Sequence, residues 1–183
     1  MNRINLLSVV ILFCLTIAGC ANPLNHVTAD RYADTCSENE DAGRLDVAEE
    51  ACKRALINAR IGHLGAEEES RYLYNFARIK QQLGKIEEAE ELLKESLKLE
   101  DGLTPPNYTR IGRRLANLSI VLGGQRRFKD AWPYLERLVP LACQYHGQER
   151  EVVRAVFERY AEEYDKLGMK SEATRLRDNA KAL

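Results

Sequence analysis

Four alanines recur along this chain at a nearly constant interval, and their spacing most constrains the fold. Ala48, Ala89, Ala131 and Ala173 are separated by 41, 42 and 42 residues. A fixed period of this size is typical of a protein built from stacked copies of one small structural unit. The residue twelve positions before each alanine is small, and the residue sixteen positions before it is large. These two sets are Cys36, Ala77, Ser119, Ala161 and Tyr32, Leu73, Leu115, Phe157.

The pattern predicts two antiparallel helices joined by a tight turn in each unit. Apolar residues at offsets of three and four mark one buried stripe per helix, and the small residues allow the two helices to approach closely. A glycine stands five residues before three of the four alanines, where the first helix ends. Pro105 and Pro106 favour a helix start after Thr104. The expected helices cover residues 28–41, 44–61, 66–82, 86–99, 105–123, 127–145, 149–167 and 170–181.

Two segments carry a family resemblance. The run Leu83-Gly-Lys-Ile-Glu-Glu-Ala-Glu-Glu-Leu-Leu93 resembles the turn and second helix of a tetratricopeptide repeat, and residues 167–173 resemble a second copy. The period near 42 and the run 131–135, with its proline, resemble the kinesin-light-chain type of this repeat. The resemblance implies an all-α fold, a right-handed superhelical array of four antiparallel helix pairs. We expect one repeat domain over 28–183, with units at about 28–61, 66–99, 105–145 and 149–181.

The N-terminal segment has the order of a secretory signal. One positive charge, Arg3, precedes an apolar stretch from Ile4 to Ile17, and small residues precede Cys20. Ile17-Ala-Gly-Cys20 resembles the lipobox of bacterial lipoproteins, in which the signal is removed before the cysteine and the cysteine is acylated. The resemblance implies a signal peptide over 1–19, lipidation such as palmitate at Cys20, and a lipidated tether over 20–27. An ordinary secreted protein and an uncleaved anchor are the alternatives.

The environment of the protein follows from the same resemblance. Ala21, rather than aspartate, follows the cysteine, which implies the outer membrane with the chain facing the periplasm.

Charges nearly cancel, with 27 basic and 28 acidic residues, so no overall attraction to nucleic acid is expected. The periplasm permits disulfides, and Cys36 with Cys52 is the only pair with a local geometric case. Whether these two form a disulfide or remain buried thiols stays open.

The motifs of common enzymes are absent from the sequence. It contains no His-Glu-x-x-His, Cys-x-x-Cys, phosphate-binding glycine loop or Gly-x-Ser-x-Gly. Two of the three histidines, His63 and His146, occupy equivalent loops between units, so repetition explains them better than metal binding. We therefore predict no enzymatic activity, no cofactor, no metal site and no small-molecule substrate.

The first helices of the units carry the predicted binding residues, because in a stacked array these helices line a concave groove. Asn75 and Asn117 share one repeat position. In the kinesin-light-chain type an asparagine at that place, in a run resembling 115–118, holds the backbone of a bound peptide, and an amide can both donate and accept. The arginine side chains there could bind carboxylates through paired hydrogen bonds. A merely solvated helix face is the alternative. The predicted peptide-binding residues are Arg71, Tyr74, Asn75, Arg78, Gln82, Arg110, Arg113 and Asn117.

These observations predict a membrane-anchored periplasmic adaptor or scaffold that binds a protein or peptide segment of the cell envelope in its groove. Envelope, pilus or secretion-complex assembly are candidate pathways by analogy alone. The alternative is a structural lipoprotein module that assembles with copies of itself. The last helix keeps few apolar residues, which suits a polar end cap better than an open stacking surface.

Overall fold

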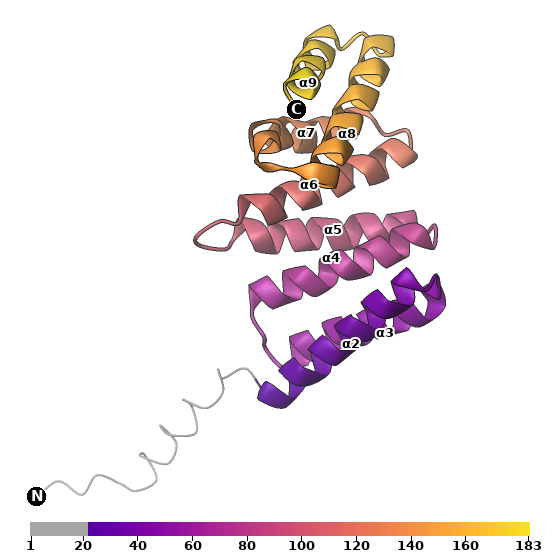
Figure 1. The fold of residues 1–183 in the computed structure, drawn as a ribbon, viewed down its shortest axis with the longest axis vertical. Coiled ribbons are helices and arrows are strands. Elements are labelled where there is room, and N and C mark those ends of the chain that lie inside the picture. The colour runs from indigo at the N-terminus through magenta and orange to yellow at the C-terminus, as the bar shows by residue number, and fades with distance from the viewer. Residues whose placement is uncertain (1–21) are drawn as a thin grey trace, which may run out of the picture.

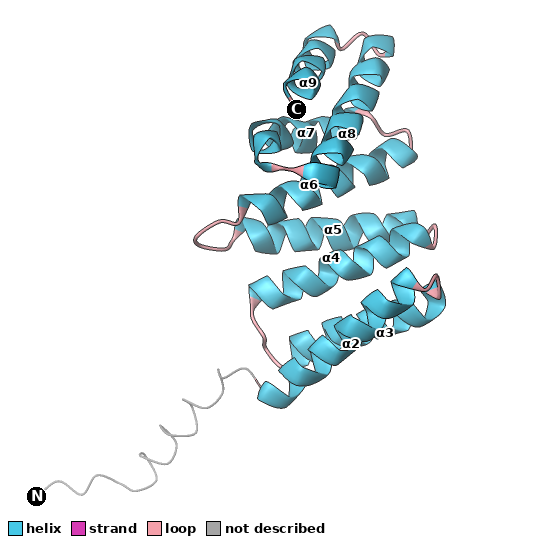
Figure 2. Cartoon of the chain, viewed as in Figure 1, coloured by secondary structure: helices cyan, strands magenta, loops and turns pink. Residues whose placement is uncertain are grey.

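The computed structural model describes residues 22–183, which form an elongated stack of helix pairs (Figure 1). The described residues contain eight α-helices and no strand, and short loops join the helices (Figure 2). The predicted all-α array of four antiparallel helix pairs is confirmed. No helix in residues 22–183 has both the length and the apolar character needed to cross a bilayer. The α-helices are α2 Pro23–Asp41, α3 Leu45–Ile61, α4 Ala66–Gln82, α5 Ile86–Asp101, α6 Tyr108–Gly124, α7 Trp132–Leu138, α8 Gly147–Lys166 and α9 Lys170–Ala182.

The repeated small residues lie where the helices of each pair meet. All four alanines of the period are fully buried, and so are the four small residues twelve positions earlier. The large side chains of the same stripe, such as Leu73, Leu115 and Phe157, are also fully buried. The sequence period therefore corresponds to the packing of one helix against its partner.

The turn inside each pair has one backbone geometry in all four units. Gly43, Gly84 and Gly168 have φ angles of 70°, 73° and 77°. Arg126 occupies the same position in the third unit, with φ 59°. This left-handed conformation costs an L-residue energy that glycine avoids. The third unit therefore keeps the turn without the residue that best suits it.

The second helix of the third unit is shorter than predicted. A continuous helix over 127–145 was expected, whereas the chain forms a 3-10 turn at Lys129–Ala131, the seven-residue α7, and a 3-10 helix at Val139–Gln144. Pro140 is the cause, because a proline inside a helix lacks the N–H donor and its ring clashes with the carbonyl four residues earlier. As a result α8 packs against α6 and the Val139–Gln144 segment, and it crosses α6 steeply in Figure 1.

Two helices begin at asparagines rather than at the predicted positions. α2 starts at Pro23 instead of 28, because the Asn22 side chain accepts a hydrogen bond from Leu24 N at 3.0 Å and proline suits the first helical position. Residues 23–27 of the expected tether are thus helical. α6 starts at Tyr108 instead of 105, because the Asn107 side chain accepts from Arg110 N at 3.0 Å. Asparagine capping outweighs the proline signal here.

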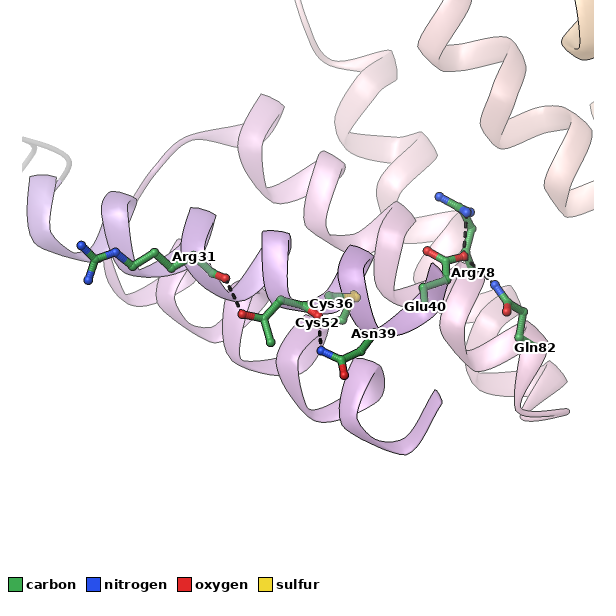
Figure 3. Close-up of a disulfide and its surroundings, with 8 residues drawn as sticks. Arg31, Cys36, Asn39, Glu40, Cys52, Arg78 and Gln82 are labelled. Carbon is green, nitrogen blue, oxygen red and sulfur yellow. Dashed lines mark hydrogen bonds and ion pairs between the residues drawn. A yellow bond between two sulfur atoms is a disulfide. The ribbon is translucent and has the colours of Figure 1, made fainter. Parts of the chain in front are cut away.

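A disulfide joins the two helices of the first unit. Cys36 on α2 and Cys52 on α3 are bonded, with their Cα atoms 5.2 Å apart (Figure 3). Asn39, whose counterparts in the third and fourth units are Leu122 and Tyr164, is buried and donates from Nδ2 to the Thr35 carbonyl at 2.7 Å. The first unit therefore replaces part of its apolar packing with a covalent bond and a satisfied amide. Cys143 is free and exposed.

Replacing Arg126 by glycine should stabilise the protein. Glycine relieves the left-handed strain, and we expect the free energy of unfolding to rise by about 1 kcal/mol. Urea denaturation checks this result, with Gly84→Ala as the matched control that should destabilise the equivalent turn by a similar amount. An unchanged or lowered midpoint for Arg126→Gly would contradict the turn assignment.

Removing the Cys36–Cys52 bridge should destabilise the protein by about 3 kcal/mol, the value expected from the chain entropy of a loop of about 15 residues. The variant is Cys36→Ser with Cys52→Ser, and Cys143→Ser is its control. A reductant should lower the melting temperature of the wild type to that of the double variant and leave the double variant unchanged. Equal stability of the oxidised wild type and the double variant would contradict a contribution from the disulfide.

Candidate peptide-binding face

The predicted binding residues lie on α4 and α6, the first helices of the second and third units. Most of their polar side chains reach across to the first helix of a neighbouring unit. Arg71 on α4 donates from Nη2 to Asp30 on α2 at 2.7 Å and also pairs with Glu68. Tyr72 Oη donates to the same Asp30 carboxylate at 2.8 Å. Arg71 therefore joins the first two units.

The Asp30 carboxylate is held in its charged form. Burial tends to raise its pKa, but the hydrogen bonds from Arg71 and Tyr72 outweigh burial and keep the pKa of Asp30 below its ordinary value. Burial raises the pKa of Tyr72, and its bond to Asp30 raises it further. The cluster thus stays an ion pair over the physiological range.

Glu40 on α2 binds two more of the predicted residues. Arg78 Nη2 lies 2.6 Å and Gln82 Nε2 lies 2.5 Å from Glu40 Oε1, and Figure 3 shows both side chains converging on this carboxylate. Arg78 and Gln82 come from the last two turns of α4. The end of this helix is therefore tied to α2 by polar contacts.

The two arginines of α6 are paired in the same way. Arg110 contacts Glu67 of α4 and donates from Nε to Glu100 of α5 at 3.0 Å. Arg113 Nε lies 2.6 Å from Glu149 of α8. All four predicted arginines thus have carboxylate partners within the chain. The carboxylates that these arginines bind thus belong to this chain, and the face carries balanced charge.

Three of the predicted residues meet at a hollow between α4, α6 and α8. Tyr74, Arg113 and Asn117 line it, and its volume is about 170 Å³. Asn117 donates from Nδ2 to Tyr74 Oη at 3.0 Å and to the Arg113 carbonyl at 2.9 Å. Within residues 22–183, the side-chain oxygen Oδ1 of Asn117 accepts no hydrogen bond. The remaining lining residues are Ala116, Tyr145, Glu149, Val152 and Val153.

A second, more apolar hollow of about 240 Å³ adjoins the first and shares Val152 with it. Val152 is 44% exposed although it is apolar. The two hollows therefore continue along the faces of α6 and α8. The second hollow is lined by Ile120, Gly123, Val152, Ala155, Val156, Arg159 and Tyr160.

Asn75 lies half-buried on α4, and within residues 22–183 its side chain makes no hydrogen bond.

Several solved structures share this architecture. BtubC (BKLC) from P. vanneervenii superposes with a TM-score of 0.71 at 22% identity, covering 84% of this chain and 62% of that protein. A putative kinesin light chain with nearly identical TPR-like repeats from Podospora anserina gives 0.63 at 19% identity, covering 84% and 74%. MamA gives 0.62 at 13% identity, covering 83% and 75%.

The fold is a tetratricopeptide-like repeat array. The chain spans less than two thirds of the length of BtubC, the first of these structures. No family model matches the sequence, and no curated protein matches it either. The likeness therefore concerns the arrangement of helices. It also agrees with the resemblance to the kinesin-light-chain type of repeat.

Tyr145 shapes the first hollow of this tetratricopeptide-like array, and sequence reasoning did not single it out. A Cβ atom on Gly112 of α6 would lie 2.0 Å from Tyr145 Oη, so only glycine leaves room for the ring. Tyr145 Oη donates to the Thr109 carbonyl at 3.0 Å, and burial raises the pKa of Tyr145 to about 12. The second unit has a serine in place of Gly112, and this difference was the available signal.

Val152 and Glu149 on α8 were also missed. Val153, Val156, Phe157 and Tyr160 form the buried stripe of α8, and Val152 lies outside it. An exposed valine beside a complete stripe was the signal that the sequence offered. Glu149 could be recognised only from its contact with Arg113, which the helix packing creates.

A buried polar cluster supports Tyr74 from beneath the face. The Arg114 guanidinium lies 4.6 Å from the centre of the Tyr74 ring and 3.2 Å from Glu100 Oε1. Ser70 Oγ donates to the same Glu100 oxygen at 2.8 Å, and Arg114 Nε donates to Ser96 Oγ at 3.0 Å. Burial lowers the pKa of Arg114. The cluster therefore joins α4, α5 and α6 and fixes the position of Tyr74.

The described residues hold no group of three or more histidine, cysteine, aspartate or glutamate side chains that could bind a metal ion.

Replacing Glu100 by glutamine should destabilise the array strongly. Arg114 would keep a buried charge with no full counter-charge, and breaking such a pair costs about 3–5 kcal/mol. Glu91→Gln is the matched control, because Glu91 is exposed and its pair with Lys94 is worth roughly 0–1 kcal/mol. Chemical denaturation of both variants measures the difference. Similar small losses in the free energy of unfolding of both variants would show that water or another side chain compensates the charge of Arg114.

Proposed function

We propose that this chain is a membrane-anchored adaptor that binds a segment of a protein partner across α4, α6 and α8. The observation that carries the proposal is the hollow where Tyr74, Arg113 and Asn117 meet exposed Val152. Arrays of this architecture present extended surfaces that suit peptide segments. The tetratricopeptide-like fold supports a role as a protein–protein interaction scaffold.

The partner segment would be recognised by two kinds of contact. The side-chain oxygen Oδ1 of Asn117 can accept a hydrogen bond from a backbone N–H of the segment, and Oδ1 of Asn75 can do the same one unit earlier. An apolar side chain of the segment would enter the hollow at Val152 and extend toward Tyr160. The ion pair between Arg113 and Glu149 at the rim would favour a polar segment of mixed charge beside that apolar anchor.

The other arginines of the face serve a different purpose in this proposal. Arg71, Arg78 and Arg110 hold neighbouring units together through Asp30, Glu40 and Glu67. They set the relative positions of α2, α4 and α6, and so they position the hollow rather than contact the partner.

The anchor is proposed from the sequence. Cys20 and the rest of the lipobox lie outside the described residues, and the resemblance supports acylation at Cys20 with attachment to the outer membrane on its periplasmic face. The adaptor would then serve an assembly of the cell envelope, pilus or secretion complex. Its action requires no catalytic group and no cofactor.

Binding can be tested with a photo-crosslinking residue at position 152 in the native envelope. The segment captured there is identified and synthesised, and its affinity is measured for the wild type and for Asn117→Ala. We expect a roughly 2- to 10-fold loss, because one net hydrogen bond is worth about 0.5–1.5 kcal/mol. Asn75→Ala should give a similar loss.

The matched control is a crosslinker at Glu136, which is exposed on the short helix α7 away from the lining of the hollow. Position 136 should not capture the same segment. Unchanged affinity of the folded Asn117→Ala variant would move the binding surface elsewhere. Capture of a second copy of this chain at position 152 would instead favour the self-assembling module.

Anchoring is tested by Cys20→Ser. The variant should lose incorporation of a labelled fatty acid completely, because the thiol is the atom acylated. Cys143→Ser, which removes the other free cysteine, should be labelled like the wild type. Labelling that persists in Cys20→Ser would contradict the lipoprotein.

A further inference from the structure

We propose that the outer end of the first unit is a membrane-contact surface that lies in the headgroup region of the bilayer. This surface consists of Leu24 and Val27 on α2 with Ile57 and Ile61 on α3. We call it the first-unit end surface. The inference rests on the proposed acylation of Cys20, and it adds the orientation of the whole array relative to the membrane.

These four side chains are strongly exposed although they are apolar. Leu24 is 71% exposed, Ile61 65%, Val27 48% and Ile57 42%. They make up half of the large apolar side chains that are exposed in residues 22–183, where only eight are found. Scattered apolar residues need no explanation, but a group at one end of a molecule indicates a contact surface.

The helix ends that carry them lie side by side. Asn22 N donates to the Gly62 carbonyl at 3.0 Å, which joins the start of α2 to the end of α3. Leu24 and Val27 are three residues apart, and Ile57 and Ile61 are four apart, so each pair shares a helix face.

The second unit packs near Val27 and Ile57, which each lie three residues from a side chain that reaches α4, whereas Leu24 and Ile61 at the helix ends remain the most exposed of the four. Asp30 on α2 faces Arg71 on α4, and Arg60 on α3 pairs with Glu69 on α4. The exposed fractions of Leu24 and Ile61 show that no described part of the chain covers the first-unit end surface. In Figure 1 this unit forms one end of the stack, and α8 and α9 form the other.

The length of chain between the anchor and α2 brings this surface to the membrane. Only Ala21 and Asn22 separate Cys20 from Pro23, the first residue of α2. Even a fully extended chain keeps Pro23 within about 11 Å of the acylated cysteine. An apolar helix face in the interface lies about 5–10 Å deep at the headgroup boundary. The first turn of α2 is therefore held at the depth where Leu24 and Val27 are favourably buried.

The charges around the surface suit phospholipid headgroups. Arg31 is exposed on α2, and Figure 3 shows its guanidinium extending along the helix toward the N-terminal end. The nearby carboxylates Asp30 and Glu50 are paired, with Arg71 and Arg54 respectively. Asp34, three residues from Arg31, is exposed and has no ion pair within residues 22–183, so the charges beside the surface are mixed, as they are in a zwitterionic headgroup.

The orientation has a consequence for the binding face. With the first unit on the bilayer, α8 and α9 point away from it, and the hollows between α4, α6 and α8 lie in the outer half of the stack. A partner segment can then reach Asn117 and Val152 without displacing lipid.

The test uses the full acylated protein in phospholipid vesicles. In a Cys143→Ser background, Leu24→Cys and Ile61→Cys are labelled separately with an environment-sensitive dye, without reductant so that the disulfide stays closed. Leu167→Cys is the matched control, because Leu167 is 43% exposed at the opposite end of the stack. Labels at 24 and 61 should shift to shorter wavelength and be quenched by lipids that carry a quencher at the headgroup. The label at 167 should do neither.

The outcomes separate this inference from the proposed function. If Cys20 is acylated but the labels at 24 and 61 stay in water, the inference is overturned and the anchor stands. Shielding of both labels from an aqueous quencher without quenching by lipid would mean that a protein covers the surface, which also overturns it. If Cys20 carries no acyl chain, both the proposed anchor and this inference are wrong.

A second variant tests whether the apolar side chains themselves hold the surface on the bilayer. Leu24→Asp with Ile61→Asp should leave the acylated protein attached but abolish lipid quenching of a label at Val27→Cys. Leu167→Asp should leave that quenching unchanged. Retained quenching in the double aspartate variant would show that the short tether alone sets the position.

Discussion

The two helices of each unit can approach closely only where both present a small side chain, and the rest of the array depends on that contact. The alanine of the second helix and the small residue of the first are fully buried in all four units. Close approach lets the large residues of both stripes pack together, and the buried apolar residues form two core clusters that meet in the second unit. It also requires the tight left-handed turn, which the third unit forms with Arg126 in place of glycine.

Contacts between units are of a different kind, and many of them are polar. Arg71, Arg78 and Arg110 each reach a carboxylate of the preceding unit. Exposed pairs of this type are worth roughly 0–1 kcal/mol each, so they fix the relative position of the units more than they stabilise them. The buried pair of Arg114 and Glu100 is satisfied by Ser70 and Ser96, which makes it specific to one arrangement of α4, α5 and α6. The face is therefore electrically balanced, and the proposed binding site is the hollow around Asn117.

That hollow results from an irregularity in the repeat. Pro140 ends α7 early, and α8 consequently packs on α6 and the 3-10 segment rather than continuing the regular stack. Tyr145 then fits against Gly112, and Val152 and Glu149 come to lie opposite Asn117. The proposed binding face and the proposed membrane-contact surface lie in different units, so that one chain could hold a membrane and a partner at once.

The sequence by itself determined the period, the helix pairs, the turn glycines and the all-α class, because helix faces and turns depend on residues three to five positions apart and their recurrence every 41 or 42 residues is visible along the chain. It also predicts the lipid anchor, from four consecutive residues that lie outside the described structure. Only the tertiary structure decided which carboxylates neutralise the arginines, since the partners of Arg71, Arg78 and Arg110 lie 41, 38 and 43 residues away. It likewise decided that Cys36 and Cys52 are bonded and that Tyr145 enters the site. The ion pairs between units depend on how far each unit is rotated against the next, and local periodicity carries no information about that rotation.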